Sequence, residues 1–163
     1  EVLFALPITA REAVLGKYLA ALGLFALFLA GTLAIPVLLL SVGSPDLGAI
    51  VAGYLGVFFL GAELLALGVL ASAITTDQIV AFVVAAVPGA ALVLLGDFRV
   101  KRVLDGLTEG QSLGSDLAAL VSPTPAFEEF LRGVVGLPAL LHLLAFTVFF
   151  LWTATRCLDR KGT

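Results

Sequence analysis

Two ionisable residues stand inside long apolar stretches of the sequence, where they are the first candidates for chemistry. Glu63 is the only charged residue between Ala49 and Ala73, and His142 is the only ionisable residue between Leu137 and Ala154. In an apolar medium a carboxyl or an imidazole can bind a proton or a substrate, or it can hydrogen-bond a neighbouring helix. For Glu63 the sequence leaves both roles open. For His142 it favours packing, because a lone histidine on an apolar helix is more often a bonded packing residue.

No motif for nucleotide, metal or nucleophilic chemistry accompanies these two residues. Gly16-Lys17 is followed by Tyr18, and Arg11 stands where a P-loop has its first glycine, so that motif fails twice. One histidine is too few for a histidine metal cluster, and nothing resembles a nucleophile elbow or a Ser-His-Asp set. We therefore expect no catalytic residue, no metal site, no cofactor and no enzyme activity in this chain.

The composition is that of a protein whose solvent is lipid. Of the 163 residues, 61% are hydrophobic and 13% charged, and the mean hydropathy is +1.15. Soluble domains have about 45–50% apolar and about 25% charged residues. The net charge of −3 also argues against nucleic-acid binding, which needs a basic surface.

Four stretches are long and apolar enough to cross a bilayer, which takes about 20 residues. They are continuous rather than alternating, and a backbone in lipid must satisfy its own hydrogen bonds, so helices are expected. The sequence therefore predicts an all-α, polytopic membrane helical bundle in a single transmembrane domain over residues 1–163. The predicted spans are residues 18–42, 49–73, 79–95 and 137–154.

The long connection at residues 96–136 carries helical apolar spacing of its own. Three short amphipathic helices are predicted there, lying at the membrane surface or capping the bundle. Their apolar faces are Val100, Val103, Leu104 and Leu107; Leu113, Leu117, Leu120 and Val121; and Phe127, Phe130, Leu131 and Val134. A packed loop with no direct role and a gate that faces the substrate are both compatible with this pattern.

Basic residues flank both ends of the set of spans. Arg11 and Lys17 precede the first span, and Arg156, Arg160 and Lys161 follow the last. With an even number of spans, the positive-inside rule predicts that both ends are cytoplasmic and that residues 96–136 are extracytoplasmic.

The segment before the first span has a well-defined helix start. Thr9 and Glu12 have the spacing of a capping box, and Pro7 ends any earlier helix, so the first helix is predicted to begin near Ala10. Residues 1–17 would then be a cytoplasmic segment whose charged side chains are available to a soluble partner. The alternative is an ordinary interfacial helix start that only anchors the chain.

Several short stretches, taken in order, resemble a known family of transporter subunits. They read EVLFALPITARE at residues 1–12, VLGKYLA at 14–20, GAIVAGYLG at 48–56, GVLASAIT at 68–75, QIVA at 78–81 and FEEFLRGVV at 127–135. This order resembles the ABC-transporter permease subunits of the type-two exporter superfamily, and most closely their gliding-motility-like branch. Two positions depart from the family pattern: Thr76-Asp77 precede Gln78 in place of a polar residue and Asn, and Glu63 stands at a usually apolar position.

The resemblance implies a permease subunit of an ATP-driven exporter in a bacterial or archaeal cytoplasmic (inner) membrane. Its partners would be a cytoplasmic P-loop ATPase, which binds the ATP, and a second permease half, identical or different. The chain would supply about the last four of six membrane helices. The segment in contact with the ATPase would include Leu6, Pro7, Thr9, Arg11 and Glu12.

Two other functions remain open at this point. One is a proton- or ion-coupled carrier that uses Glu63 and His142, for which the sequence lacks the expected internal repeat. The other is a structural membrane protein that transports nothing.

Overall fold

The computed structural model describes residues 9–107 and 113–161, and every regular element within these ranges is a helix. The helices are α1 (Ala10–Gly31), α2 (Ala34–Val42), α3 (Leu47–Ile74), α4 (Gln78–Leu95), α5 (Phe98–Leu107), α6 (Leu113–Val121), α7 (Thr124–Leu131) and α8 (Leu137–Lys161). Four segments are long and apolar enough to cross a membrane: α1 with α2, α3, α4, and α8. The predicted all-α bundle is confirmed, and the chain is a multi-pass membrane protein.

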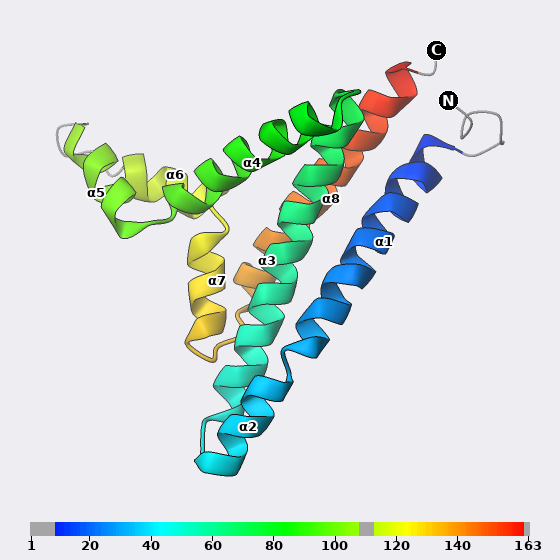
Figure 1. Cartoon of the computed structure of the whole chain (residues 1–163). Helices are drawn as coiled ribbons and strands as arrows, with labels where there is room; N and C mark the ends of the chain where they lie inside the picture. Colours follow the sequence, from blue (N-terminus) through cyan, green and yellow to red (C-terminus); the bar gives the residue numbers. More distant parts are fainter. Residues whose placement is uncertain (1–8, 108–112, 162–163) are drawn as a thin grey trace.

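Helix α3 is the centre of the bundle. It packs against α8 along much of its length and also contacts α1, α4 and α7. The start of α1 and the end of α8 lie at the same end of the bundle, together with the turn from α3 to α4, whereas α2 lies at the opposite end (Figure 1). Helix α4 leans away from the bundle and carries α5 and α6 as a side arm. We call α5 and α6 together the arm.

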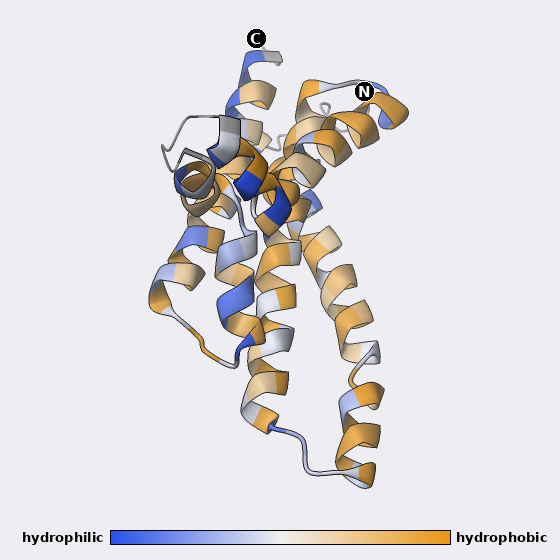
Figure 2. Cartoon of the chain, turned by 90° about the vertical axis from the view of Figure 1, so that its left-hand side faces the viewer, coloured by the Kyte–Doolittle hydropathy of each residue, from blue (hydrophilic) through white to orange (hydrophobic). Residues whose placement is uncertain are grey.

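Apolar residues cover most of the surface of the long helices, and hydrophilic residues gather at helix ends and on the short helices (Figure 2). Leu27, Phe28, Phe82 and Val148 are among the large apolar side chains that the chain itself leaves uncovered. An apolar surface of this extent is what contact with lipid requires.

Aspartates and threonines fix where the helices begin. The predicted capping box at α1 is present, with the Thr9 backbone N–H donating to Glu12 Oε2 at 2.8 Å and the Glu12 N–H donating to Thr9 Oγ1 at 3.3 Å. Asp46 caps α3 by accepting from the Gly48 N–H at 2.8 Å. Asp77 caps α4 in the same way, accepting from the Ile79 N–H at 2.7 Å.

The predicted first span, residues 18–42, lies within the candidate span Ala10–Val42, but its helix is interrupted, which the sequence did not predict. Helix α1 ends at Gly31, and α2 begins at Ala34. Pro36 has no N–H to donate to the Thr32 carbonyl, so the α-helical pattern cannot continue through that turn. The Thr32 carbonyl instead accepts from the Ile35 N–H at 3.0 Å and from the Tyr54 hydroxyl of α3 at 3.0 Å.

The other three spans are close to their predicted ranges, and α8 continues beyond residue 154 to Lys161. The three short helices predicted within residues 96–136 are present as α5, α6 and α7. Helix α7 is more than a surface helix, because its Phe130 is fully buried in a cluster with Ala126, Ala139 and Leu143. Gly56 of α3 allows this approach, since a Cβ there would lie 2.6 Å from the Phe130 Cβ.

Candidate functional site

Polar side chains from three helices meet at the end of the bundle where α1 begins. Lys17 of α1 donates a hydrogen bond from Nζ to Ser72 Oγ near the end of α3. Beside this bond is a pocket of about 480 Å³. We call it the polar end pocket; its polar lining residues are Lys17, Ser72, Thr75, Thr76, Asp77 and Gln78. The Lys17–Ser72 bond joins the first turns of α1 to the last turn of α3.

The structure places three of the five predicted coupling residues at this same end. Thr9 and Glu12 are hydrogen-bonded to each other in the capping box, and Arg11 is exposed between them. Leu6 and Pro7 lie outside the described residues. The start of α1 is thus a rigid, hydrogen-bonded turn that presents one cation, Arg11, to whatever lies outside the bundle.

Glu63 lies in the middle of α3 and is fully buried, which confirms that it faces the bundle rather than lipid. Neither of its carboxyl oxygens has a hydrogen-bond partner among residues 9–107 and 113–161. A buried polar group without a partner is costly, at about 1–3 kcal/mol in protein mutational data. In the described bundle, Glu63 is therefore a fully buried carboxyl whose burial no hydrogen bond offsets.

His142 lies in the first half of α8 and is only partly buried. Its ring packs against Phe146, with the ring centroids 4.9 Å apart, and its Nε2 has no hydrogen-bond partner in the described part of the chain. The packing expected for His142 is present as a ring contact, without the expected hydrogen bond. No hydrogen bond in the described chain joins His142 to Glu63, so the two predicted polar candidates do not form one site.

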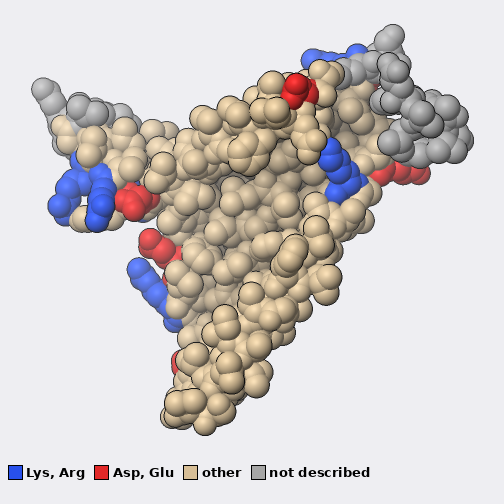
Figure 3. All heavy atoms as spheres, in the orientation of Figure 1, with Lys and Arg blue, Asp and Glu red and all other residues tan. Residues whose placement is uncertain are grey.

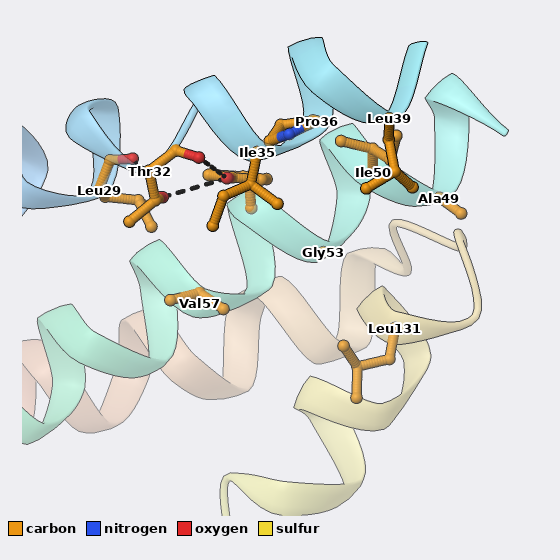
Figure 4. A pocket seen from close by; sticks show the side chains of 11 residues that line it. Leu29, Thr32, Ile35, Pro36, Leu39, Ala49, Ile50, Gly53, Val57 and Leu131 are labelled. Atoms are coloured by element: carbon orange, nitrogen blue, oxygen red, sulfur yellow. Dashed lines mark hydrogen bonds between the residues drawn. The ribbon is translucent and has the colours of Figure 1, made fainter. Parts of the chain in front are cut away.

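An apolar pocket of about 450 Å³, which was not predicted from the sequence, lies between α1, α2 and α3. Leu29, Ile35, Ile50, Val57 and Leu131 are among its lining side chains, and Figure 4 shows the Thr32–Tyr54 hydrogen bonds at its wall. The pocket lies beside the break between α1 and α2, and Thr32, Ile35 and Pro36 at this break are among its lining residues. Pro36, inside the first apolar stretch, was the signal that could have predicted it.

No group of three or more His, Cys, Asp or Glu side chains that could hold a metal ion occurs within the described ranges. No protein family, curated protein or solved structure matches this chain. The fold and the apolar spans together define its class, a multi-pass α-helical membrane protein with two distinct polar features. These are the polar end pocket with the start of α1, and the isolated carboxyl of Glu63.

Proposed function

We propose that this chain is a membrane-spanning permease subunit of an ATP-driven ABC exporter. It would line the translocation path with a second permease half, and a separate cytoplasmic P-loop ATPase would bind and hydrolyse the ATP. The proposal combines the order of the sequence motifs with one structural observation. That observation is the hydrogen bond between Lys17 and Ser72, which joins the first turns of α1 to the end of α3.

The mechanism follows from how this end of the bundle is connected. An ATPase bound at the start of α1 would push on a turn that its capping box holds rigid. Because Lys17 is bonded to Ser72, a displacement of α1 would also move the end of α3, and α3 contacts every other long helix. A rigid-body movement of this kind is a common way to switch packed helices between two arrangements. In this proposal the end with Thr9, Arg11 and Glu12 is cytoplasmic.

The test begins with the full-length protein purified gently from its native membrane. We expect a P-loop ATPase to copurify in a fixed ratio, and the purified complex to hydrolyse ATP. Arg11→Glu should reduce the recovered ATPase about ten-fold or more, since reversing a charge at a protein contact opposes the partner's complementary charge. Arg132→Glu is the matched control, because that side chain is 77% exposed at the end of α7 and should leave recovery unchanged.

Complete recovery of the chain without any P-loop ATPase, under conditions that preserve other membrane complexes, would refute the exporter proposal. If Arg11→Glu recovers as much ATPase as the unsubstituted chain, the role of the α1 start is refuted, but the exporter proposal is not.

Glu63 supports one alternative, a proton- or ion-coupled carrier. A carboxyl inside the membrane that lacks a partner is a default candidate for such a role. In that case Glu63→Gln should abolish transport driven by a proton or ion gradient while the protein still folds and inserts. The exporter proposal predicts instead that ATP-driven transport continues in Glu63→Gln. If neither ATP nor an ion gradient drives any flux, the chain is a structural membrane protein.

A further inference from the structure

Helix α5 directly follows α4, which is long and apolar enough to cross a membrane. Helix α4 has 18 residues, which at ~1.5 Å per residue span ~27 Å, close to the ~30 Å hydrocarbon core of a bilayer. Only Gly96 and Asp97 separate the end of α4 from the start of α5 at Phe98. If α4 crosses the bilayer, α5 lies at the membrane surface, because it carries Arg99, Lys101 and Arg102 and charged side chains are costly in the hydrocarbon core.

The exposed side of α5 combines two cations with two large apolar side chains. Phe98 and Val103 are each 62% exposed, and Arg99 and Arg102 are exposed beside them. The Arg102 guanidinium lies over the Phe98 ring, 4.2 Å from its centroid. On the opposite side, Val100 and Leu104 are half-buried, and the Leu104 Cβ lies close to Gly114 of α6.

The acids near this helix are used to shape the arm. Asp97 accepts from the Arg99 backbone N–H at 2.8 Å and so caps α5. Asp105 accepts from the backbone N–H groups of Gly114 at 2.8 Å and Ser115 at 3.3 Å, which fixes the start of α6 on α5.

Arg99 and Arg102 form no ion pair with the nearby acids Asp97, Asp105 and Asp116. No ion pair within the described ranges involves Arg99 or Arg102, and the ion pair found there joins Arg132 and Glu128 of α7. Figure 3 shows basic side chains on the lower side of the arm near its outer end, with an acidic side chain next to them. An exposed face with unpaired arginines and large apolar side chains matches the surface of an anionic bilayer, in which phosphates lie just above acyl chains.

We propose that α5 is a membrane-surface anchor that binds the headgroups of anionic phospholipids. The guanidinium groups of Arg99 and Arg102 bind the headgroup phosphates, while Phe98 and Val103 insert among the upper acyl chains. Because α5 follows α4 after only two residues, the anchor holds the end of α4 at the surface and fixes its lean away from the bundle. The proposal does not depend on the exporter function.

The experiment uses a fluorescent reporter on α5 of the full chain in phosphatidylcholine vesicles. Val103→Cys in a Cys157→Ser background carries an environment-sensitive dye, and the quencher is a spin label borne by phosphatidylglycerol or, at the same mole fraction, by phosphatidylcholine. We expect the anionic lipid to quench several-fold more strongly than phosphatidylcholine. The difference should shrink at high salt, because screening weakens interactions between exposed charges.

Substitutions test whether the arginines produce this preference. Arg99→Gln with Arg102→Gln should remove most of it and leave the two lipids nearly equal as quenchers, since each basic residue near an anionic leaflet raises the affinity about five-fold. Arg99→Lys with Arg102→Lys keeps the charge and should restore most of it. Arg132→Gln is the control on another helix and should leave it unchanged.

Equal quenching by the two lipids would overturn the headgroup assignment, and no quenching by either would overturn the placement of α5 at the membrane. If Arg132→Gln reduces the preference for the anionic lipid as much as Arg99→Gln with Arg102→Gln does, a site on α5 is also refuted. Each variant is compared after its helical content and elution have been matched to those of the unsubstituted chain.

Discussion

Helices α3 and α4 are neighbours in sequence and both are apolar enough to cross a membrane, yet they differ sharply in how the chain covers them. Nine residues of α3 are buried, whereas in α4 the described chain buries one, Gly89. In lipid there is no hydrophobic driving force between helices, so apolarity alone cannot decide which helix is central. Close packing decides it, and α3 has the small residues that permit close packing.

The glycines of α3 show most clearly how small residues permit close packing. Gly56 receives the Phe130 side chain of α7, and Gly61 receives the ring of Phe25 of α1. Helix α4 has one comparable position, Gly89, where a Cβ would lie 3.5 and 3.7 Å from the tips of Leu67 and Leu64. The comparison teaches that small residues facing large side chains, rather than hydropathy, distinguish a central helix from a peripheral one.

The largest effect is expected for Gly56→Val in α3. Its Cβ would lie 2.6 Å from the Cβ of Phe130, which is fully buried and cannot move aside. We expect a loss of about 3 kcal/mol in the free energy of unfolding, measured by denaturant titration in mixed micelles.

Gly53→Val is the matched control for this prediction. It places the same side chain on the same helix, and nothing lies within 4 Å of a Cβ at Gly53. It should cost under about 0.5 kcal/mol. Similar losses for the two variants would mean that the Gly56–Phe130 contact does not set the stability of α3.

Glu63→Leu should be stabilising, by about 1–2 kcal/mol in the same titration. The buried carboxyl has no partner within the described chain, so an apolar side chain of similar size removes a desolvation cost without breaking a bond. Glu63→Gln keeps a polar group at the site and should change the stability little. A marked destabilisation by Glu63→Leu would show that the carboxyl binds a group supplied from elsewhere, which would favour the carrier alternative.

The sequence was a good guide wherever a single local cause decides the structure. The Thr9–Glu12 capping box and the start of α1 at Ala10 followed from spacing alone, and the apolar spacing of Phe127, Phe130 and Leu131 predicted α7. That Glu63 faces the bundle followed from its place on a stripe with Gly53 and Gly56. The ATPase contact, the transport function and the orientation in the membrane stay predictions.

The misses involve contacts between residues far apart in the chain. The break between α1 and α2 needs Pro36, but it is completed by the hydroxyl of Tyr54 on another helix. The Lys17–Ser72 bond joins residues 55 positions apart, and no local pattern points to it. The periodicity of a sequence predicts which face of a helix is apolar. It does not predict which distant residue will donate a hydrogen bond to a backbone carbonyl that has lost its helical partner.

Tyr54→Phe tests the break between α1 and α2, with an expected loss of about 1 kcal/mol. The Tyr54 hydroxyl donates to the Thr32 carbonyl at 3.0 Å, and removing it leaves this acceptor with the Ile35 N–H alone. Tyr18→Phe is the control, because no hydrogen bond of the Tyr18 hydroxyl is found in the described chain. A loss in Tyr18→Phe as large as that in Tyr54→Phe would contradict this account of the break.

The smallest loss of stability is expected for Val87→Ala on α4. Val69→Ala makes the same change on α3, so the two variants compare the two helices directly. Val87 is 64% exposed, whereas Val69 is 6% exposed within a core cluster. In micelles of the purified chain, Val69→Ala should cost about 1 kcal/mol through lost packing, and Val87→Ala under about 0.5 kcal/mol. The same two variants can also be compared in the native membrane. If Val87→Ala there costs as much stability as Val69→Ala, although it costs little in micelles, another subunit covers Val87 on α4. That result would be the one expected if a second permease half packs there.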